Sequence, residues 1–217
     1  MSVDSGGDVG SLWLARTIYE LGGIEFGSFT LGRSTIDSPI YLKPKVLISN
    51  PGALRTAASL IHAETVSRAA MRNPGCGPFD LVAGVPFGGL HIATSFSLSC
   101  DRPLIYVKSL NEDDTTDRIE GRFLPGQSVL IVDDLISAGG SMVRTAAVLR
   151  DAGLKVTDAV ALVDREQGGA EELHRHGINL IPVLKMTTIL NYYMAEGWIS
   201  EANFRRSLDV IRSSRAD

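Results

Sequence analysis

The feature that most constrains the fold is the rhythm of the chain from residue 80 onward. Short apolar runs without inside–outside alternation, such as "DLVAGV", "PLIYV" and "SVLIVDD", alternate with helical segments such as "SMVRTAAVLRDAG". Strands that alternate with helices form βαβ units, and strands without a polar face are covered on both sides. We therefore predict an α/β protein with a parallel sheet flanked by helices.

The N-terminal part of the chain does not share this rhythm. We expect the polar, glycine-rich residues 1–10 to be a flexible leader and 11–45 to form a small hood subdomain over the sheet. The core then spans 46–185, and 186–217 is predicted to form two C-terminal helices. A length of 217 residues suits one such domain, 11–217.

One segment after the hood's first strand holds two prolines. "SPIYLKPKVLIS" is predicted to be a strand, and Pro39 and Pro44 confine it to a sheet edge because proline has no N–H to donate.

Composition narrows the classes of function. The net charge of −4 argues against nucleic acid as the main partner, and no apolar run approaches the roughly 20 residues that span a bilayer. The N-terminus lacks the pattern of a signal peptide. Cys76 and Cys100 have no metal-ligand spacing, and two cysteines in a chain of this size suit a reducing cytoplasm. We expect a cytoplasmic protein with neither a nucleic-acid nor a membrane partner.

Two adjacent carboxylates, Asp133 and Asp134, stand where an apolar run ends. The short segment "LISAGGS" follows and leads into a helix, whose first amides are unpaired and lie at the positive end of its dipole. A glycine-rich turn at a helix start lets backbone N–H groups approach an anion, so 137–141 are predicted to hold a phosphate. The carboxylates suit a ligand that adds hydroxyls or a metal, as a phosphorylated ribose does. The alternative is that the aspartates only cap a loop.

The run of four apolar residues, two acids and a small-residue loop resembles the phosphoribosyl-pyrophosphate motif of type I phosphoribosyltransferases. Together with "FGSFTL…SPIYL", "VAGVPFGGLHIAT", "IEG" and "LVDREQGG", the motif is similar in order and spacing to orotate phosphoribosyltransferases over about residues 20–185. The resemblance implies a parallel sheet with an N-terminal hood. It also implies Mg²⁺-dependent transfer of ribose 5-phosphate from phosphoribosyl pyrophosphate to orotate, giving orotidine 5'-monophosphate in pyrimidine biosynthesis.

The resemblance also implies roles for individual residues. Asp133 and Asp134 would bind the ribose hydroxyls, Lys108 would act with them in catalysis, and Arg165 would bind the carboxylate of orotate. A guanidinium forks onto a carboxylate in a way that lysine cannot copy. The alternative for Arg165 is a salt bridge to Asp164 or Glu166. The predicted phosphoribosyl-pyrophosphate set is Lys108, Asp133, Asp134, Leu135, Ile136, Ser137, Ala138, Gly139, Gly140 and Ser141, and Ser137 would also lie against the base.

Three further expectations follow from the resemblance. The turn "VPFGG" (85–89) would hold pyrophosphate. Arg33 lies near the position of a family lysine, in a segment one residue longer than in the family. No side chain is predicted to bind a metal directly, because Mg²⁺ is expected to enter on the pyrophosphate and the ribose.

The polar stretch 107–121, "VKSLNEDDTTDRIEG", departs from the family. There the family shows a pattern like R-K-x-x-K-x-H/Y-G, which reaches across a dimer to pyrophosphate. Losing one such cation commonly costs about 2–4 kcal/mol of transition-state stabilisation. The alternative is a solvated linker with Lys108 at its edge. Lys108 is kept, whereas the other matched positions hold Val107, Asn111, Asp113 and Asp114, and Glu112 and Asp117 add two more acids.

Three functional interpretations stay open. In the first, the chain is a working orotate phosphoribosyltransferase, with Lys108, Arg118 or Arg122 replacing the lost cations. In the second, it is a transferase for another carboxylated or related base. In the third, it is a non-catalytic module that binds phosphoribosyl pyrophosphate or a nucleotide and regulates a partner. We expect the first, as a homodimer whose substrates are small molecules. The lone helical His91 is expected to be a core or surface residue.

Overall fold

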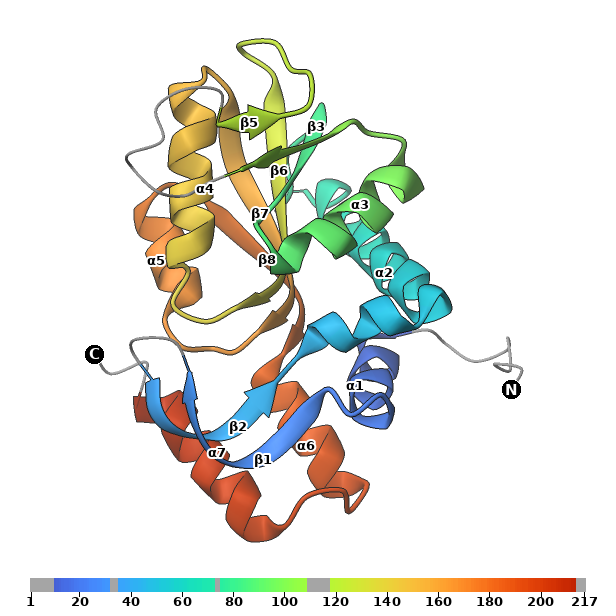
Figure 1. Cartoon of the computed structure of the whole chain (residues 1–217), viewed down its shortest axis with the longest axis vertical. Helices are drawn as coiled ribbons and strands as arrows, with labels where there is room; N and C mark the ends of the chain where they lie inside the picture. Colours follow the sequence, from blue (N-terminus) through green and yellow to red (C-terminus); the bar gives the residue numbers. More distant parts are fainter. Residues whose placement is uncertain (1–9, 32–34, 73–74, 109–117, 214–217) are drawn as a thin grey trace.

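The computed structural model describes residues 10–31, 35–72, 75–108 and 118–213 (Figure 1). The elements follow one another along the chain as α1 (Ser11–Glu20), β1 (Ile24–Leu31), β2 (Thr35–Leu42), the 3₁₀ helix η1 (Pro44–Ser49), α2 (Pro51–Ala69), β3 (Leu81–Gly84), α3 (Gly88–Cys100), β4 (Leu104–Val107), β5 (Ile119–Glu120), β6 (Ser128–Ile136), α4 (Gly140–Asp151), β7 (Lys155–Asp164), α5 (Gly169–Arg175), β8 (Asn179–Lys185), α6 (Met186–Ala195) and α7 (Glu201–Ser213).

A six-stranded sheet forms the centre of the molecule, in the order β5-β4-β3-β6-β7-β8. Five strands run parallel, and the short β5 pairs antiparallel with β4 at one edge. In Figure 1, α4 and α5 cover one face of the sheet, while α2 and α3 cover the other. The predicted α/β fold with a parallel sheet between helices is confirmed.

The central strands are covered on both faces, as their sequences predict. Every residue of β3 is buried, and the last seven residues of β7 are buried without alternation. Such strands need a helix layer on each side, because an apolar side chain on either face would otherwise meet water. This explains why the chain returns to a helix after almost every strand.

A separate antiparallel pair, β1 and β2, lies at the opposite end of the molecule from β5 (Figure 1). The C-terminal helix α7 packs along β2, and α6 packs on α7. This pair and the C-terminal helices lie below the central sheet in Figure 1. The division into a hood (11–45), a core (46–185) and C-terminal helices (186–217) stays a prediction.

The strand predicted for 38–49 is only half right. Strand β2 ends at Leu42, and η1 begins at Pro44. Proline's fixed φ suits the first position of a helix, where no N–H is required. Leu47 turns inward and is buried, which fixes the helical turn against α2. The consequence is that Lys45 stands at the start of a helix instead of at a sheet edge.

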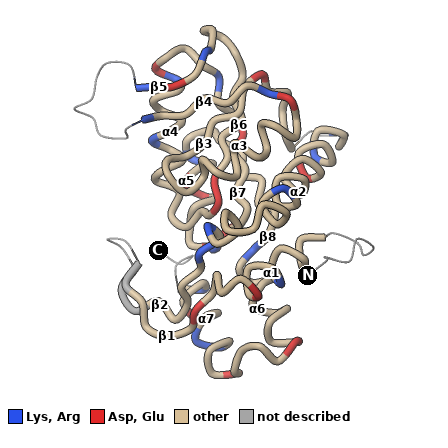
Figure 2. Tube along the Cα trace, turned by 45° about the vertical axis from the view of Figure 1, so that its right-hand side comes forward, with Lys and Arg blue, Asp and Glu red and all other residues tan. Residues whose placement is uncertain are grey.

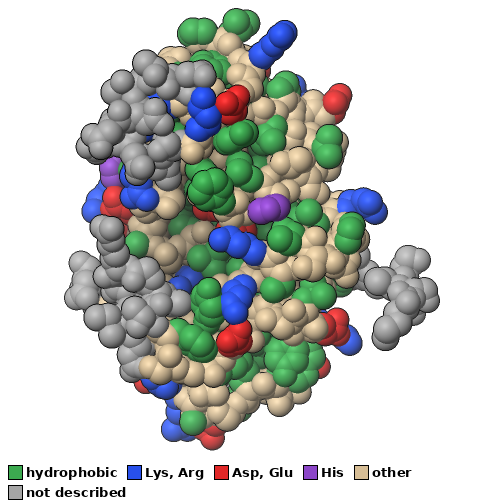
Figure 3. All heavy atoms as spheres, in the orientation of Figure 1, with side chains coloured by type: hydrophobic (Ala, Val, Ile, Leu, Met, Phe, Trp, Pro, Cys, Tyr) green, Lys and Arg blue, Asp and Glu red, His purple; other side chains and the backbone are tan. Residues whose placement is uncertain are grey.

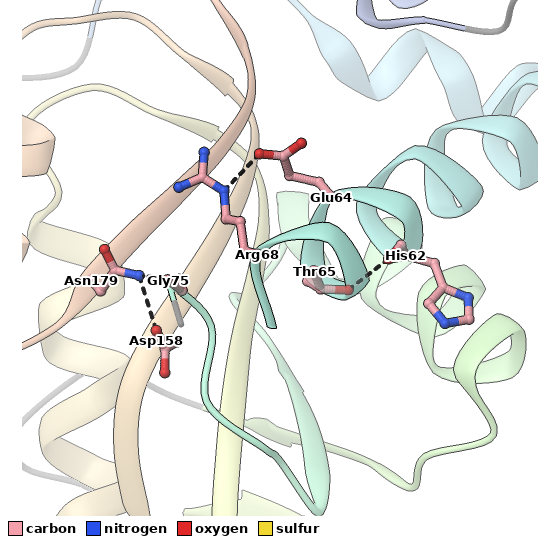
Figure 4. Close-up of polar contacts among 7 residues, drawn as sticks. All are labelled: His62, Glu64, Thr65, Arg68, Gly75, Asp158 and Asn179. Carbon is pink, nitrogen blue, oxygen red and sulfur yellow. Dashed lines mark hydrogen bonds and ion pairs between the residues drawn. The ribbon is translucent and has the colours of Figure 1, made fainter. Parts of the chain in front are cut away.

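Polar contacts fasten the chain at the end of α2 to the far strands of the sheet (Figure 4). The Asn179 side chain donates to the backbone oxygen of Gly75 and to Asp158, and Asp158 also accepts from the backbone N–H of Gly77. Near the end of the same helix, Arg68 donates to Glu64 at 2.6 Å. The bonds from Asn179 and Gly77 satisfy the buried carboxylate of Asp158, since a buried acceptor without partners is costly.

Within the described part of the chain, no helix is long and apolar enough to span a membrane.

Candidate active site

The candidate site lies where neighbouring parallel strands differ in length. β3 pairs with β6 only as far as Gly84 and Val132, whereas β6 continues to Ile136 along β7. Between β3 and β6 the strand order also reverses, and such a switch point is the usual ligand crevice of an open parallel sheet. The prediction that the strand ends at the acid pair is therefore wrong. Asp133 and Asp134 lie inside β6, because β7 goes on pairing with it.

The two carboxylates of the pair are almost completely removed from water. Asp133 is 7% exposed and Asp134 is 9% exposed. The Asp133 carboxylate accepts the backbone N–H of Asp134 at 2.9 Å. Burial, and then the neighbouring Asp134 charge, raise the pKa of Asp133 well above its ordinary value, while the charge of Lys45 lowers it. This charge density favours a ligand that brings hydroxyl protons or a cation.

Directly after β6, the predicted phosphate loop lines an open pocket of about 410 Å³. Gly139 caps α4 with a φ of +83°, a conformation that residues with a side chain seldom adopt. The loop residues and the start of α4 line this pocket, and their role in holding a phosphate stays a prediction. Within this pocket the structure brings together Asp133, Leu135, Ile136, Ser137, Ala138, Gly139, Gly140 and Ser141 of the predicted set, with Met142 and Arg144 added.

Across the crevice, the turn before α3 lies against the acid pair. A Cβ on Gly89 would come within 2.6 Å of the Val132 backbone oxygen and within 2.8 Å of an Asp133 carboxylate oxygen. A Cβ on Gly88 would come within 2.5 Å of an Asp134 carboxylate oxygen. Only glycine allows this approach, so the turn predicted to hold pyrophosphate borders both carboxylates.

Arg165 follows β7 at the same edge of the sheet. Its backbone N–H donates to Ile136, and its side chain donates to the Ser38 hydroxyl of β2 at 3.2 Å. Arg165 is 8% exposed, and its Nε has no hydrogen-bond partner among the described residues. Burial lowers its pKa. A buried guanidinium whose one described side-chain partner is a neutral hydroxyl can still accept a carboxylate as its charged partner.

The proposed salt bridge of Arg165 to its sequence neighbours is not formed. Asp164 instead accepts the backbone N–H of Glu166, and Glu166 accepts the backbone N–H of Thr187 at the start of α6. The alternative explanation of Arg165 as half of a local ion pair is therefore wrong.

Sequence reasoning missed the residues that enclose Arg165. Ser38 comes from the hood strand, and Ser207 and Ile211 come from the last helix, 42 or more positions away in the chain. Together with Met186 they leave a hollow of about 10 Å³, room for about one water molecule. The motif "SPIYL" pointed to this strand, but no local pattern identifies which late helix covers the arginine.

Lys108 lies at the edge of the crevice region, where β4 ends. Its ammonium pairs with Glu120 of β5 at 3.3 Å, and it lines neither the phosphate-loop pocket nor the Arg165 hollow. Its predicted role in binding and catalysis stays a prediction. Arg33 and the loop positions Asn111, Glu112, Asp113, Asp114 and Asp117 lie outside the described residues.

Charge is separated around the crevice. Figure 2 shows acidic positions inside the molecule beside β7, with basic positions below them toward the β1–β2 pair. Among the described residues, no three His, Cys, Asp or Glu side chains come together as a ready-made metal cage. Two adjacent carboxylates are hard oxygen donors of the kind Mg²⁺ accepts, and Mg²⁺ usually completes its shell with waters and substrate phosphates. The residues present fit a magnesium ion that arrives with its substrate.

Residues 54–179 match the phosphoribosyl transferase domain family. The fold and the site therefore define a phosphoribosyltransferase. The chain is 36% identical to the orotate phosphoribosyltransferase of Pyrococcus abyssi over 81% of this chain and 93% of that protein. It belongs to the orotate phosphoribosyltransferase family.

A solved relative and a longer relative agree with this assignment. The crystal structure of orotate phosphoribosyltransferase from Aeropyrum pernix superposes with a TM-score of 0.69 at 29% identity, covering 85% of this chain and 99% of that chain. The uridine 5'-monophosphate synthase of Bos taurus is 38% identical over 82% of this chain. The chain spans only 35% of the length of that bovine relative.

Proposed function

We propose that the chain transfers ribose 5-phosphate from phosphoribosyl pyrophosphate to orotate, giving orotidine 5'-monophosphate and pyrophosphate for pyrimidine nucleotide synthesis. The observation that carries this proposal is the buried guanidinium of Arg165, which has no carboxylate partner among the described residues and whose Nε has no hydrogen-bond partner there, one strand away from the acid pair and its phosphate loop. A base with a carboxylate satisfies Arg165, whereas a base without one leaves it unpaired.

Each part of the site has a proposed role in this reaction. The amides of 137–141 hold the 5-phosphate, and Asp133 and Asp134 bind the ribose hydroxyls. The turn 85–89 borders the pyrophosphate, and Arg165 with Ser137 orients the base. Catalysis then depends on positioning and electrostatics. The ribose C1 becomes cationic as pyrophosphate leaves, and N1 of orotate is held close to the opposite face of C1, where it forms the new bond.

A magnesium ion is part of the proposal. Bound Mg²⁺ supplies positive charge to the pyrophosphate oxygens, and Asp133 or Asp134 would hold it through the ribose or through water. Lys108 would contribute from the edge of the crevice. These roles rest on the family and on the donor set of the site.

We also propose a homodimer that works in the cytoplasm. Large apolar side chains stand exposed on α2, on α3 and on the turn before it. They include Val66, Phe87 and Leu98. Exposed large apolar side chains on adjacent helices favour an interface between copies. Light scattering at micromolar concentration tests this, and a monomeric mass would contradict it.

The activity is tested by mixing the protein with phosphoribosyl pyrophosphate, Mg²⁺ and orotate, and following the loss of orotate absorbance. We expect orotate to be consumed in step with pyrophosphate release, and the reaction to stop when EDTA is added. Uracil, which lacks the carboxylate, is the matched control and should react far more slowly. Turnover of another base but not orotate would favour the second interpretation, and tight binding without turnover would favour the third.

A further inference from the structure

A lysine that the sequence did not single out lies beside the acid pair. Lys45 is exposed and is the second residue of η1. A Cβ on Gly88 would lie 2.8 Å from the Lys45 Cε and 2.5 Å from an Asp134 carboxylate oxygen. The lysine side chain and the carboxylate therefore converge on the same glycine, at the first residue of α3.

Lys45 also shares a hollow with the pyrophosphate side of the crevice. Gly88, His91 and Asp134 line this hollow together with it. In Figure 3, Lys or Arg side chains and a histidine gather on the visible face over the region where α3 begins. The segments involved, η1 and the start of α3, are far apart in the sequence and come together only in the fold.

The ammonium of Lys45 is not committed to a carboxylate. Among the described residues, no ion pair within 4.0 Å involves Lys45, whereas its neighbour Lys43 pairs with Glu25 and Lys108 pairs with Glu120. Lys45 is nevertheless close enough to lower the pKa of Asp133, against the larger opposing effects of burial and Asp134. Its charge is therefore felt inside the site and is available to a ligand.

The chemistry of the leaving group requires such a cation. The turn "VPFGG" carries no lysine or arginine, and the loop 107–121, which supplies cations in the family, holds five acids here against Lys108 and Arg118. Two buried carboxylates border the same turn and repel a pyrophosphate. A positive side chain that lies beside this turn but comes from outside the 107–121 loop, as Lys45 does, offsets that repulsion.

We propose that Lys45 binds the pyrophosphate group of phosphoribosyl pyrophosphate beside the 85–89 turn, taking the part of the cations that the 107–121 loop lacks. This inference rests on the proposed function, since it concerns the leaving group of that reaction. It makes η1 a part of the catalytic site and makes Lys45 a residue that contacts substrate on the side opposite to the phosphate loop.

The test compares two ligands that differ only in the pyrophosphate. Calorimetric titration of Lys45→Met with Mg²⁺-phosphoribosyl pyrophosphate should give at least tenfold weaker binding than wild type. Titration with ribose 5-phosphate should stay within twofold. Lys45→Arg should restore most of the lost affinity, because it restores the charge. Lys43→Met, two residues away and already paired with Glu25, is the matched control and should change neither titration.

Turnover adds a second measure. Lys45→Met should lower kcat about 10²-fold or more, because the charge of the leaving group grows in the transition state. If Lys45→Met weakened the binding of both ligands equally, or the binding of neither, the role of Lys45 would be overturned. If orotate turnover by wild type fails but the two ligands still discriminate as described, Lys45 keeps its role and only the proposed reaction falls. If wild type turns over orotate normally and Lys45→Met matches it in both titrations and in kcat, the proposed reaction stands and the role of Lys45 falls.

Discussion

Asp133 and Arg165 are titratable groups that the fold removes almost entirely from water, and among the described residues the side chain of each has a neutral hydrogen-bond partner. Asp133 accepts a backbone N–H, and Arg165 donates to a hydroxyl. A fold selected for stability alone would pair such charges or replace them with apolar groups. At the scale of single residues, the proposed site is therefore a set of charged groups with few partners among the described residues, and we expect a substrate to supply the others.

Arg165 gives the first prediction at this scale. Arg165→Met should weaken orotate binding by about 2–5 kcal/mol, roughly 30-fold or more, because a buried carboxylate would lose its charged partner. Arg165→Lys should recover little, since an ammonium cannot make two parallel hydrogen bonds. Titration with orotate in the presence of ribose 5-phosphate and pyrophosphate measures the effect.

Ribose 5-phosphate binding is the control for Arg165→Met and should not change. The melting temperature of the variant should not fall, because the buried Nε of Arg165 has no hydrogen-bond partner among the described residues and its side chain donates to a neutral hydroxyl. Equal losses for orotate and for the sugar phosphate would remove Arg165 from the base site.

Asp133 gives a prediction about pH. Its pKa is raised in the folded protein, so the folded state binds the proton more tightly than the unfolded chain. The ionised carboxylate therefore costs stability as pH rises from the ordinary aspartate range through the raised pKa. Asp133→Asn should be more stable than wild type at pH 7, and the difference should vanish near pH 4. Denaturant unfolding at both pH values measures this.

The same Asp133 variant should lose most of its affinity for phosphoribosyl pyrophosphate. The control is Asp151→Asn at the exposed end of α4, which should alter neither stability nor binding. A stability difference that grows toward acid would show that the carboxylate is stabilised by the fold, contrary to this account.

Single residues also show where sequence reasoning reaches its limit. The acid pair and the small-residue loop were found because their chemistry is local: adjacent carboxylates next to a helix start. Ser38 and Lys45 were not found as site residues, because each acts through neighbours more than 40 residues away in the chain. A lysine after a proline has no local pattern that separates a solvated charge from a ligand.

At the scale of elements, the crevice arises from the unequal lengths of β3 and β6. The alternating runs of the sequence predicted both strands and their burial. They did not predict that β6 continues past the aspartates, because its last residues are held by β7 and not by their own composition. Likewise, the sequence of η1 favours a strand, because an isolated apolar stretch does not reveal a 3₁₀ turn that packing stabilises.

The glycine turn before α3 gives the prediction at this scale. Gly89→Ala should destabilise the fold by about 1–3 kcal/mol, because its Cβ would overlap the Val132 oxygen and the Asp133 backbone. It should also lower activity by displacing Asp133. Thermal unfolding and the orotate assay measure the two effects.

Gly75→Ala is the matched control for the glycine turn, since a Cβ there meets only the Arg68 side chain at 3.8 Å or more. A melting temperature for Gly89→Ala equal to that of Gly75→Ala would mean that the turn is looser than the structure shows.

At the scale of the whole molecule, the proposed base site joins parts from both ends of the chain. The Tyr193 hydroxyl donates to the backbone oxygen of Ala15 at 2.7 Å, and Tyr19 stacks on Trp198, so α1 and the C-terminal region are fastened together. The Arg165 hollow between β2 and α7 has room for about one water molecule. The ring of orotate therefore stays outside this hollow unless β2 or α7 moves.

The position of Arg165 between β2 and α7 predicts that bound ligands make these two elements more rigid. Hydrogen exchange of the β2 and α7 amides should slow when orotate and ribose 5-phosphate are both bound. Exchange in the middle of α2, which contacts neither substrate in this account, should stay nearly constant. Slowing spread evenly over the molecule would indicate general stabilisation in place of local closure.

The most direct test of the central claim is a crystal structure of the protein with orotidine 5'-monophosphate. We predict the phosphate against the 137–141 amides, the ribose hydroxyls at Asp133 and Asp134, and the base carboxylate within hydrogen-bond distance of Arg165. Nucleotide density elsewhere, with this crevice empty, would contradict the account.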